Sequence, residues 1–252
     1  MKVSVVVPVY NDRRVGRALD SILSQQLDHA LELIVVDAGS TDGTLDVVMG
    51  YADDISVLIS EPDNGIFDGL NKGIRSTTGD AEDVVHYLGA DDRYADPFVL
   101  RDVTDAFLED AEVDACYGDL LYVNEAGRLV RRWHAGHFRR RKLYWGWLPP
   151  HLTLFLRRSV YNQHGMFDLR YRVSSDQDFM LRLLLQNGVS TRYLPRALIE
   201  MAPGGNSGTI GGICRGNLEA IRMRREHRMP VPYLVVPLRV ASKVVQFMRL
   251  RL

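Results

Sequence analysis

The feature of this sequence that most constrains its fold is an alternation of short β-branched runs with helical patterns along its first part. Patterns of helical period, such as Ala18, Leu19, Ile22 and Leu23, lie between several of the runs. Strands that alternate with helices predict βαβ units and a mostly parallel sheet with helices on both faces. Ligands of such sheets bind beyond the carboxyl ends of the strands. The runs are Val3–Val7, Glu32–Val36, Ser56–Ile59, Asp83–Tyr87 and Val113–Tyr117.

From about residue 118 the pattern changes. Leu120–Val123 and Leu129–Arg132 flank a turn and predict a β-hairpin. A helix is expected at Asp176–Gln186, with Ser174 or Ser175 as its cap. Pro230 and Pro232 mark a boundary before the last twenty residues. The other expected elements are a strand at Leu152–Leu156, a helix from Ser159, a strand over Tyr193–Met201, a Gly-rich loop at Pro203–Gly212 and a basic helix to about Arg228.

The net charge of −1 hides a division of the chain. Residues 1–127 carry 8 Lys and Arg against 26 Asp and Glu, or −18, whereas residues 128–252 carry 23 against 6, or +17. We expect the first part to bind a cation and the second an anionic partner. The 46% hydrophobic content is ordinary for a soluble globular protein. Two cysteines, Cys116 and Cys214, favour a reducing compartment, and we expect no cleavable signal at Met1.

Carboxylates follow two of the predicted strands, Asp37 after the second and Asp91-Asp92 after the fourth. A carboxylate pair after a strand suits Mg²⁺ or Mn²⁺, with water and phosphate oxygens as the remaining ligands. Each acid alone fits a turn or a helix cap equally well. Together, at one edge of the sheet, they predict a nucleotide held by base and ribose contacts with a metal on its diphosphate. The Gly-x-Gly-x-x-Gly and Walker loops are both absent.

These strand ends resemble the family 2 glycosyltransferases, inverting enzymes with the GT-A nucleotide-sugar fold. Val5–Asn11 resembles the opening strand of the family, Val35–Thr44 its second motif and Leu88–Asp92 its metal motif. Asp63–Ile74 is similar to a signature of the bacterial subgroup that builds O-antigen and exopolysaccharide. The resemblance runs from residue 3 to about 212. It implies an α/β GT-A fold, a Rossmann-like sheet flanked by helices.

The resemblance assigns several residues to the nucleotide and the metal. Asp37 accepts a hydrogen bond from the uracil ring, Asp91 touches the ribose, and Asp92 holds Mn²⁺ or Mg²⁺ against the diphosphate. The helix after Asp63 would bring its residues close to the nucleotide, although the amide of Asn71 is equally consistent with helix packing. The residues implied for the nucleotide are Pro8, Tyr10, Asp37, Asn71, Lys72 and Asp91.

The second half is expected to supply the catalytic base and the acceptor side. Ser174–Leu183 resembles the acidic motif of the family, in which Asp176 matches the base and Ser175 stands where Glu is common. The alternative role of Asp176 is a helix N-terminal acid that the dipole favours. His151 matches a segment that lines the acceptor pocket or the diphosphate, although a structural histidine is also consistent. Gly205 and Ser207 belong to a loop whose amides are expected to bind an anion, or to a plain connection.

A basic segment, Arg139–Lys142, lies among aromatic residues, a pattern typical of nucleic-acid binding or of a membrane interface. The tail favours the membrane. As a helix, Tyr233–Leu252 places a polar stripe opposite an apolar side, which is typical of an amphipathic helix lying on an anionic surface. The alternative is a helix packed on the domain or on the second copy of a homodimer. The polar stripe comprises Arg239, Ser242, Lys243, Gln246 and Arg249.

We therefore expect an inverting glycosyltransferase that moves a sugar from a nucleotide-sugar, a UDP-sugar by resemblance, to a hydroxyl of a lipid-linked glycan. It would act in surface polysaccharide synthesis at the cytoplasmic face of the membrane. Residues 1–228 form the expected GT-A domain, with a donor half at 1–127 and an acceptor half at 128–228, and residues 229–252 form the basic helix. The alternatives are a nucleotidyltransferase, which needs a Gly-rich loop where Tyr10–Asp12 stands, and a non-catalytic nucleotide-sugar-binding protein at the membrane.

Overall fold

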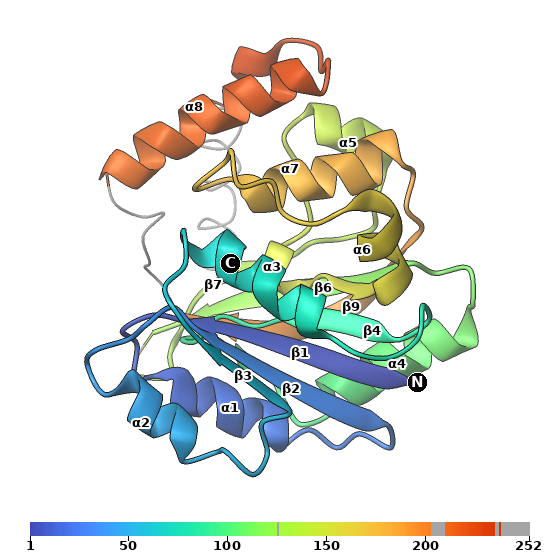
Figure 1. The fold of residues 1–252 in the computed structure, drawn as a ribbon. Coiled ribbons are helices and arrows are strands. Elements are labelled where there is room, and N and C mark those ends of the chain that lie inside the picture. The colour runs from blue at the N-terminus through green and yellow to red at the C-terminus, as the bar shows by residue number, and fades with distance from the viewer. Residues whose placement is uncertain (125, 203–209, 235–236, 238–252) are drawn as a thin grey trace.

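The computed structural model of the chain describes all residues except 125, 203–209, 235–236 and 238–252 (Figure 1). Its first half contributes four parallel strands, which confirms the first four strands predicted from the sequence. β1 pairs with both β2 and β4, so it lies inside the sheet and needs cover on both faces. These strands are β1 (Lys2–Val9), β2 (Ala30–Asp37), β3 (Val57–Ser60) and β4 (Val84–Tyr87).

The second half adds antiparallel pairs, so the sheet as a whole is mixed. The predicted hairpin is present, but its first strand is continuous with the run predicted at Val113–Tyr117. The strands are β5 (Arg93–Tyr94), β6 (Ala115–Val123), β7 (Leu129–Trp133), β8 (Phe155–Arg157) and β9 (Thr191–Met201). Over the described residues they complete a nine-stranded sheet in the order β3-β2-β1-β4-β8-β6-β9-β5, with β7 paired to β6.

Helices cover both faces of this sheet (Figure 1). In the view of Figure 1, α1 and α2 lie below the sheet, and α3, α6 and α7 lie above it, with α8 outermost. The helices are α1 (Val15–Leu23), α2 (Thr44–Met49), α3 (Ile66–Ser76), α4 (Val99–Glu109), α5 (Arg140–Tyr144), α6 (Arg158–His164), α7 (Ser175–Leu181) and α8 (Ile210–Glu226). Shorter turns are η1 (His151–Thr153), the π-helical η2 (Arg182–Gln186) and η4 (Pro232–Leu234).

The close packing of α3 on β1 brings the helix directly over the strand ends. A Cβ added at Gly73 would lie 2.3 Å from Cγ1 of Val6, so only glycine permits this approach. Val6 and its neighbours Val5 and Val7 are fully buried. Burial on both faces explains why β1 is a continuous apolar run rather than an alternating one.

Three sequence predictions in the second half require correction. The predicted strand at Leu152–Leu156 is the 3-10 turn η1 followed by β8. Ser174 is the N-cap residue of α7, as predicted, but neither serine side chain caps the helix, because the Ser174 hydroxyl bonds to the carbonyl of Gly216 and the Ser175 hydroxyl to that of Asp168. The predicted helix is α-helical only to Leu181 and continues as the π-helical η2.

Two sequence predictions fall largely outside the described residues. Gly205 and Ser207 lie in 203–209, and most of the expected tail helix lies in 235–236 and 238–252. The start of that tail forms η4. Within the described ranges, none of the helices is both long and apolar enough to cross a bilayer.

A buried arginine fastens β8 to the end of α4. Arg157 is 4% exposed, and its guanidinium donates to the carbonyls of Val113, Glu82, Phe107 and Ala111 at 2.7, 3.1, 3.2 and 3.4 Å. The last carbonyls of a helix have no partner within the helix. A single side chain therefore satisfies several carbonyls that would otherwise be buried without a donor.

We predict that Arg157→Met lowers the free energy of unfolding by about 3 kcal/mol or more, because buried carbonyls lose their donors. Urea denaturation measures the change. The control is Arg101→Ala, whose partner Asp102 is adjacent and partly exposed, and which should change stability by less than about 0.5 kcal/mol. Equal stability of the two variants would contradict the role assigned to Arg157.

Candidate active site

The loops after β1 and β2 are tied together at the edge of the sheet. Asn11 has a left-handed backbone with φ of 46°, a conformation that asparagine tolerates better than most residues. Its amide nitrogen donates to the Ser40 hydroxyl at 2.8 Å, and its side-chain oxygen accepts from the Thr41 nitrogen at 2.9 Å. The two strand ends therefore form one rigid rim.

Asp37 lies behind this rim and is fully buried. Its carboxylate accepts from the Ser40 nitrogen at 3.1 Å and from the Ser60 hydroxyl at 2.7 Å. Pro8 is buried on the neighbouring strand, whereas Tyr10 is 62% exposed. The structure thus brings together the three residues predicted for the base pocket, and it gives Asp37 partners in its own loops.

The two predicted residues on α3 have different surroundings. Asn71 is 2% exposed, and its amide donates to the Phe167 carbonyl at 2.9 Å and accepts from the Phe167 nitrogen at 3.0 Å. These contacts favour the packing alternative for Asn71. The Lys72 ammonium lies 2.8 Å from the Glu61 carboxylate and donates to the Pro62 carbonyl. Glu61 raises the pKa of Lys72, so the ammonium stays charged beside the predicted nucleotide.

Asp92 is the most unusual acid of the described residues. It is 4% exposed, and its Oδ1 atom is buried without a hydrogen-bond partner in the described part of the chain. Burial and the adjacent charge of Asp91 raise the pKa of Asp92 to about 8. A Cβ added at Gly89 would lie 2.4 Å from the Asp92 carboxylate, so the loop needs glycine at that position.

Asp91 is more open and faces the loop after β1. Its carboxylate lies 3.2 Å from the Arg14 guanidinium, which also pairs with Asp12 at 2.6 Å. No cluster of three or more His, Cys, Asp or Glu suited to a metal ion occurs among the described residues. The site fits a cation that keeps water and phosphate oxygens as ligands, because the unpaired oxygen of Asp92 needs a positive partner.

Asp176 lies at the start of α7 and contacts His151 in η1. The Nδ1 atom of His151 is 3.5 Å from Oδ2 of Asp176. The imidazole stacks on Tyr87, with ring centroids 6.3 Å apart. Burial and then the charge of Asp176 raise the pKa of Tyr87. Because Tyr87 ends β4, Asp176 lies close to the strand that leads into Asp91 and Asp92.

The other acid of the same motif, Asp178, is buried and already paired. Its carboxylate contacts Arg182 at 2.9 Å and His227 at 2.8 Å. The Arg182 guanidinium also donates to the carbonyls of His164 and Met166. Asp178 is therefore structural, and Asp176, with 13% of its side chain exposed against 7% for Asp178, is the more accessible acid of this motif.

Sequence reasoning did not identify Tyr87 or Phe167 as parts of the site. Phe167 packs against Tyr87 and Phe179, with ring centroids 5.6 and 4.9 Å apart, so it joins β4 to α7. The position of Tyr87 as the last residue of a predicted strand was an available signal. Phe167 joins β4 to α7 because its main chain is held by Asn71, and a single sequence does not reveal this distant contact.

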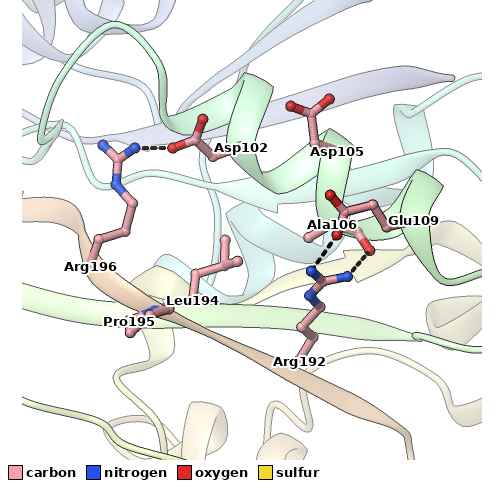
Figure 2. Close-up of a pocket in the computed structure, with 8 residues that line it drawn as sticks. All are labelled: Asp102, Asp105, Ala106, Glu109, Arg192, Leu194, Pro195 and Arg196. Atoms are coloured by element: carbon pink, nitrogen blue, oxygen red, sulfur yellow. Dashed lines mark hydrogen bonds and ion pairs between the residues drawn. The ribbon is translucent and has the colours of Figure 1, made fainter.

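A pocket of about 330 Å³ between α4 and β9 is separate from this site (Figure 2). It lies toward the start of β9, whereas Asp92 bonds to the backbone of Ala202, just after the end of that strand. Figure 2 shows Arg196 paired with Asp102 and Arg192 with Glu109. The lining residues are Asp102, Asp105, Ala106, Glu109, Arg192, Leu194, Pro195 and Arg196, and none of them was predicted for the site.

Comparisons with known proteins decide the family. Residues 4–165 match the glycosyl transferase family 2 domain. The chain is also 30% identical, over 194 residues, to a PGL/p-HBAD biosynthesis glycosyltransferase of Mycobacterium bovis, an alignment that covers 76% of this chain and 73% of the relative. The chain belongs to glycosyltransferase family 2.

Solved structures agree on the fold of this family 2 glycosyltransferase. S. aureus TarS 1-349 in complex with UDP-GlcNAc aligns with a TM-score of 0.65 at 20% identity, over 89% of this chain and 67% of that one. The mannosyltransferase PcManGT from Pyrobaculum calidifontis, in complex with GDP-Man and Mn²⁺, aligns with a TM-score of 0.65 at 20% identity, over 94% and 68%. The chain spans 39% of a longer TarS structure. The expected GT-A fold is thereby confirmed.

The family membership also decides between the functional alternatives. The chain is a glycosyltransferase, so the nucleotidyltransferase and non-catalytic alternatives no longer hold. The family match ends at residue 165, before Asp176. The role of Asp176 therefore depends on its sequence motif and on its position beside Tyr87 and His151.

The raised pKa of Asp92 predicts a specific pH dependence of stability. Between the ordinary value of 3.8 and the folded value of about 8, the folded state holds the proton more tightly than the unfolded state, so wild-type stability falls as pH rises. Asp92→Asn removes this term. We expect the melting temperature of the variant, relative to wild type, to rise by at least about 4 °C between pH 5 and pH 9.

Differential scanning calorimetry of both proteins without added metal provides the measurement. Asp91→Asn is the matched control and should give a smaller change, because Asp91 is more exposed and faces Arg14. If the difference in melting temperature between Asp92→Asn and wild type did not change with pH, ionised Asp92 would not destabilise the folded protein. When the scans are repeated with Mn²⁺, the metal should raise the melting temperature of wild type but not that of Asp92→Asn.

Proposed function

We propose that this chain is an inverting glycosyltransferase that transfers a sugar from a UDP-sugar to a hydroxyl of a lipid-linked acceptor in surface polysaccharide synthesis. The observation that carries the proposal is the position of Asp176. This carboxylate is the more accessible acid of its motif, and it lies beside the end of β4, the strand that leads into Asp91 and Asp92. The proposed base, Asp176, and the acid proposed for the diphosphate, Asp92, then lie near the same end of β4.

The donor is assigned to the rim formed by β1 and β2. Pro8, Tyr10 and Asp37 lie on adjacent strand ends there and form the proposed base pocket. Asp91 is assigned to the ribose, and Lys72 to the nearby anionic groups. Support for UDP comes from the fold shared with TarS, which was solved with UDP-GlcNAc and with UDP, while PcManGT was solved with GDP-Man.

Asp92 is assigned as the protein ligand of Mn²⁺ or Mg²⁺. A bound cation would give the buried Oδ1 atom of Asp92, unpaired among the described residues, a partner. It would also lower the raised pKa of this carboxyl. PcManGT was solved with Mn²⁺. When bound, the metal supplies Lewis-acid stabilisation of the negative charge on the departing diphosphate.

The chemistry is a single displacement at the anomeric carbon. The acceptor oxygen forms a bond to that carbon as the bond from carbon to the diphosphate oxygen breaks. Asp176 takes the proton from the acceptor hydroxyl, and the electron pair of the broken bond leaves with the nucleoside diphosphate. His151, 3.5 Å from Asp176, holds the carboxylate in place. Attack opposite the leaving group inverts the anomeric configuration.

The proposed acceptor side carries an excess of basic and aromatic residues. Trp145 is 68% exposed and Tyr144 40%, next to the basic residues of α5. The Arg225 guanidinium lies 4.9 Å from the ring of Tyr233, which is 55% exposed. Exposed Trp and Tyr beside Arg and Lys suit the anionic interface of a bilayer. This charge pattern supports a lipid-linked acceptor and a peripheral membrane location, with homodimerisation as the alternative use of the tail.

The donor assignment is tested by thermal shift with UDP, GDP and dTDP, each with and without Mn²⁺. A ligand that binds the folded state raises the melting temperature by mass action, so UDP with Mn²⁺ should give the largest rise, of several degrees at saturation. Asp92→Asn is the control and should lose the part of the rise that depends on Mn²⁺. If GDP with Mn²⁺ raised the melting temperature more than UDP with Mn²⁺, the assigned nucleotide would be GDP instead of UDP.

The base assignment is tested with Asp176→Asn. The variant should lose at least about 10³-fold in kcat, because the amide cannot take the proton, while it keeps the thermal shift with UDP and Mn²⁺. His151→Gln should lose only about tenfold, since the base remains. NMR of the product should show the anomeric configuration opposite to that of the donor. Full turnover by Asp176→Asn, or a retained configuration, would exclude this mechanism.

A further inference from the structure

The backbone immediately before α7 is held by a carboxylate from α8. Three successive amide nitrogens converge on Glu219: that of Arg172 donates to Oε1 at 3.0 Å, and those of Val173 and Ser174 donate to Oε2 at 2.9 Å each. Hydrogen bonds to an ionised acceptor are shorter and stronger than neutral ones. Asp176 follows two residues after this anchored segment.

The same face of α8 makes further contacts on both sides of Asp176. The carbonyl of Gly216, one turn before Glu219, accepts from the Ser174 hydroxyl at 3.4 Å. A Cβ at Gly216 would lie 3.3 Å from Val173, so glycine permits close packing there. Just beyond the end of the helix, His227 contacts Asp178 at 2.8 Å. The residues before Asp176 are therefore fastened to α8, and Asp178 after it is fastened to the residue that follows α8.

The acids of the second half are concentrated around the segment that Glu219 holds. Only six acids follow residue 127, in a region with a net charge of +17. All except Glu200 lie on α7, on α8 or in the loop before α7. Glu219 is half-buried, and its two oxygens accept from three main-chain amides. The six acids are Asp168, Asp176, Asp178, Glu200, Glu219 and Glu226.

We propose that Glu219 is a positioning residue for transfer: it fixes the Arg172–Ser174 backbone so that Asp176 faces the acceptor hydroxyl. This inference rests on the proposed role of Asp176 as base. Glu219 does not touch the reacting atoms, and it acts through the main chain that leads into α7. Because proton transfer requires a distance of about 3 Å, a small displacement of this backbone lowers the rate without altering donor binding.

The test compares Glu219→Ala and Glu219→Gln with Glu226→Gln as a matched control. Glu226 lies on the same helix and accepts from the Tyr171 hydroxyl and from Arg222, but it has no main-chain amide as partner in the described contacts. Glu219→Ala should lower kcat about 10- to 100-fold, and Glu219→Gln by less, because the amide oxygen still accepts hydrogen bonds. Glu226→Gln should stay within about threefold of wild type.

Two further readouts distinguish a positioning role of Glu219 from a merely structural one. The donor KM and the thermal shift with UDP and Mn²⁺ should be unchanged in both Glu219 variants. Hydrogen–deuterium exchange should accelerate at residues 172–178 in Glu219→Gln and remain unchanged at β1. Unchanged kcat in Glu219→Ala, an equal loss in Glu226→Gln, or a parallel loss of donor binding would each overturn the proposal.

The outcome also distinguishes this inference from the assignment of the base. Full turnover by Asp176→Asn overturns the base, and this inference with it. An inactive Asp176→Asn together with a fully active Glu219→Ala overturns the positioning role alone. An inactive Asp176→Asn with a slow Glu219→Ala that still binds UDP and Mn²⁺ supports both.

Discussion

The geometry of the site depends on one pair of hydrogen bonds, between the Asn71 amide on α3 and the main chain of Phe167. Asn71 belongs to the half of the chain that carries Asp37, Asp91 and Asp92, and Phe167 precedes the helix that carries Asp176. The pair is buried, so water does not compete for it. Behind it, Phe167 packs on Tyr87 and Phe179. The distance between the proposed donor side and the proposed base is therefore set inside the core rather than by a surface loop.

The electrostatics of the chain follow from this arrangement. The proposed donor half has an excess of acids, yet Asp37 is paired within its own loop and Asp91 with Arg14, after β1. Asp92 stands apart, with a buried oxygen unpaired among the described residues. The proposed acceptor half is strongly basic, and all of its acids except Glu200 lie on α7, on α8 or in the loop before α7. The division between −18 and +17 therefore fits the proposed function: an anionic donor would require a cation on one side, and on the other side carboxylate contacts hold the segment that carries the proposed base.

The sequence predicted the first half of the fold well because its signals are local. The valine run of β1 and the turn residues after β2 reflect burial and backbone geometry at those positions. The failures depend on distant contacts. Leu152–Leu156 has the composition of a strand, but Thr153 bonds to Gly118 and Pro150, and this keeps its first residues in a 3-10 turn. Likewise Ser174 occupies the N-cap position of α7, but its hydroxyl bonds to Gly216, 42 residues away, instead of to the helix end.

The one departure from the family motif at the base has a physical reason in this structure. Ser175 stands where the resemblance places Glu, and here it is fully buried, with its hydroxyl donating to the Asp168 carbonyl at 2.9 Å. A carboxylate in that position would be desolvated and would repel the charges of the neighbouring Asp176 and Asp178. With Ser175 neutral, the acid that stabilises the segment comes from α8, where Glu219 meets three amides. The segment before the proposed base is thus held by a negative charge that bonds to the main chain.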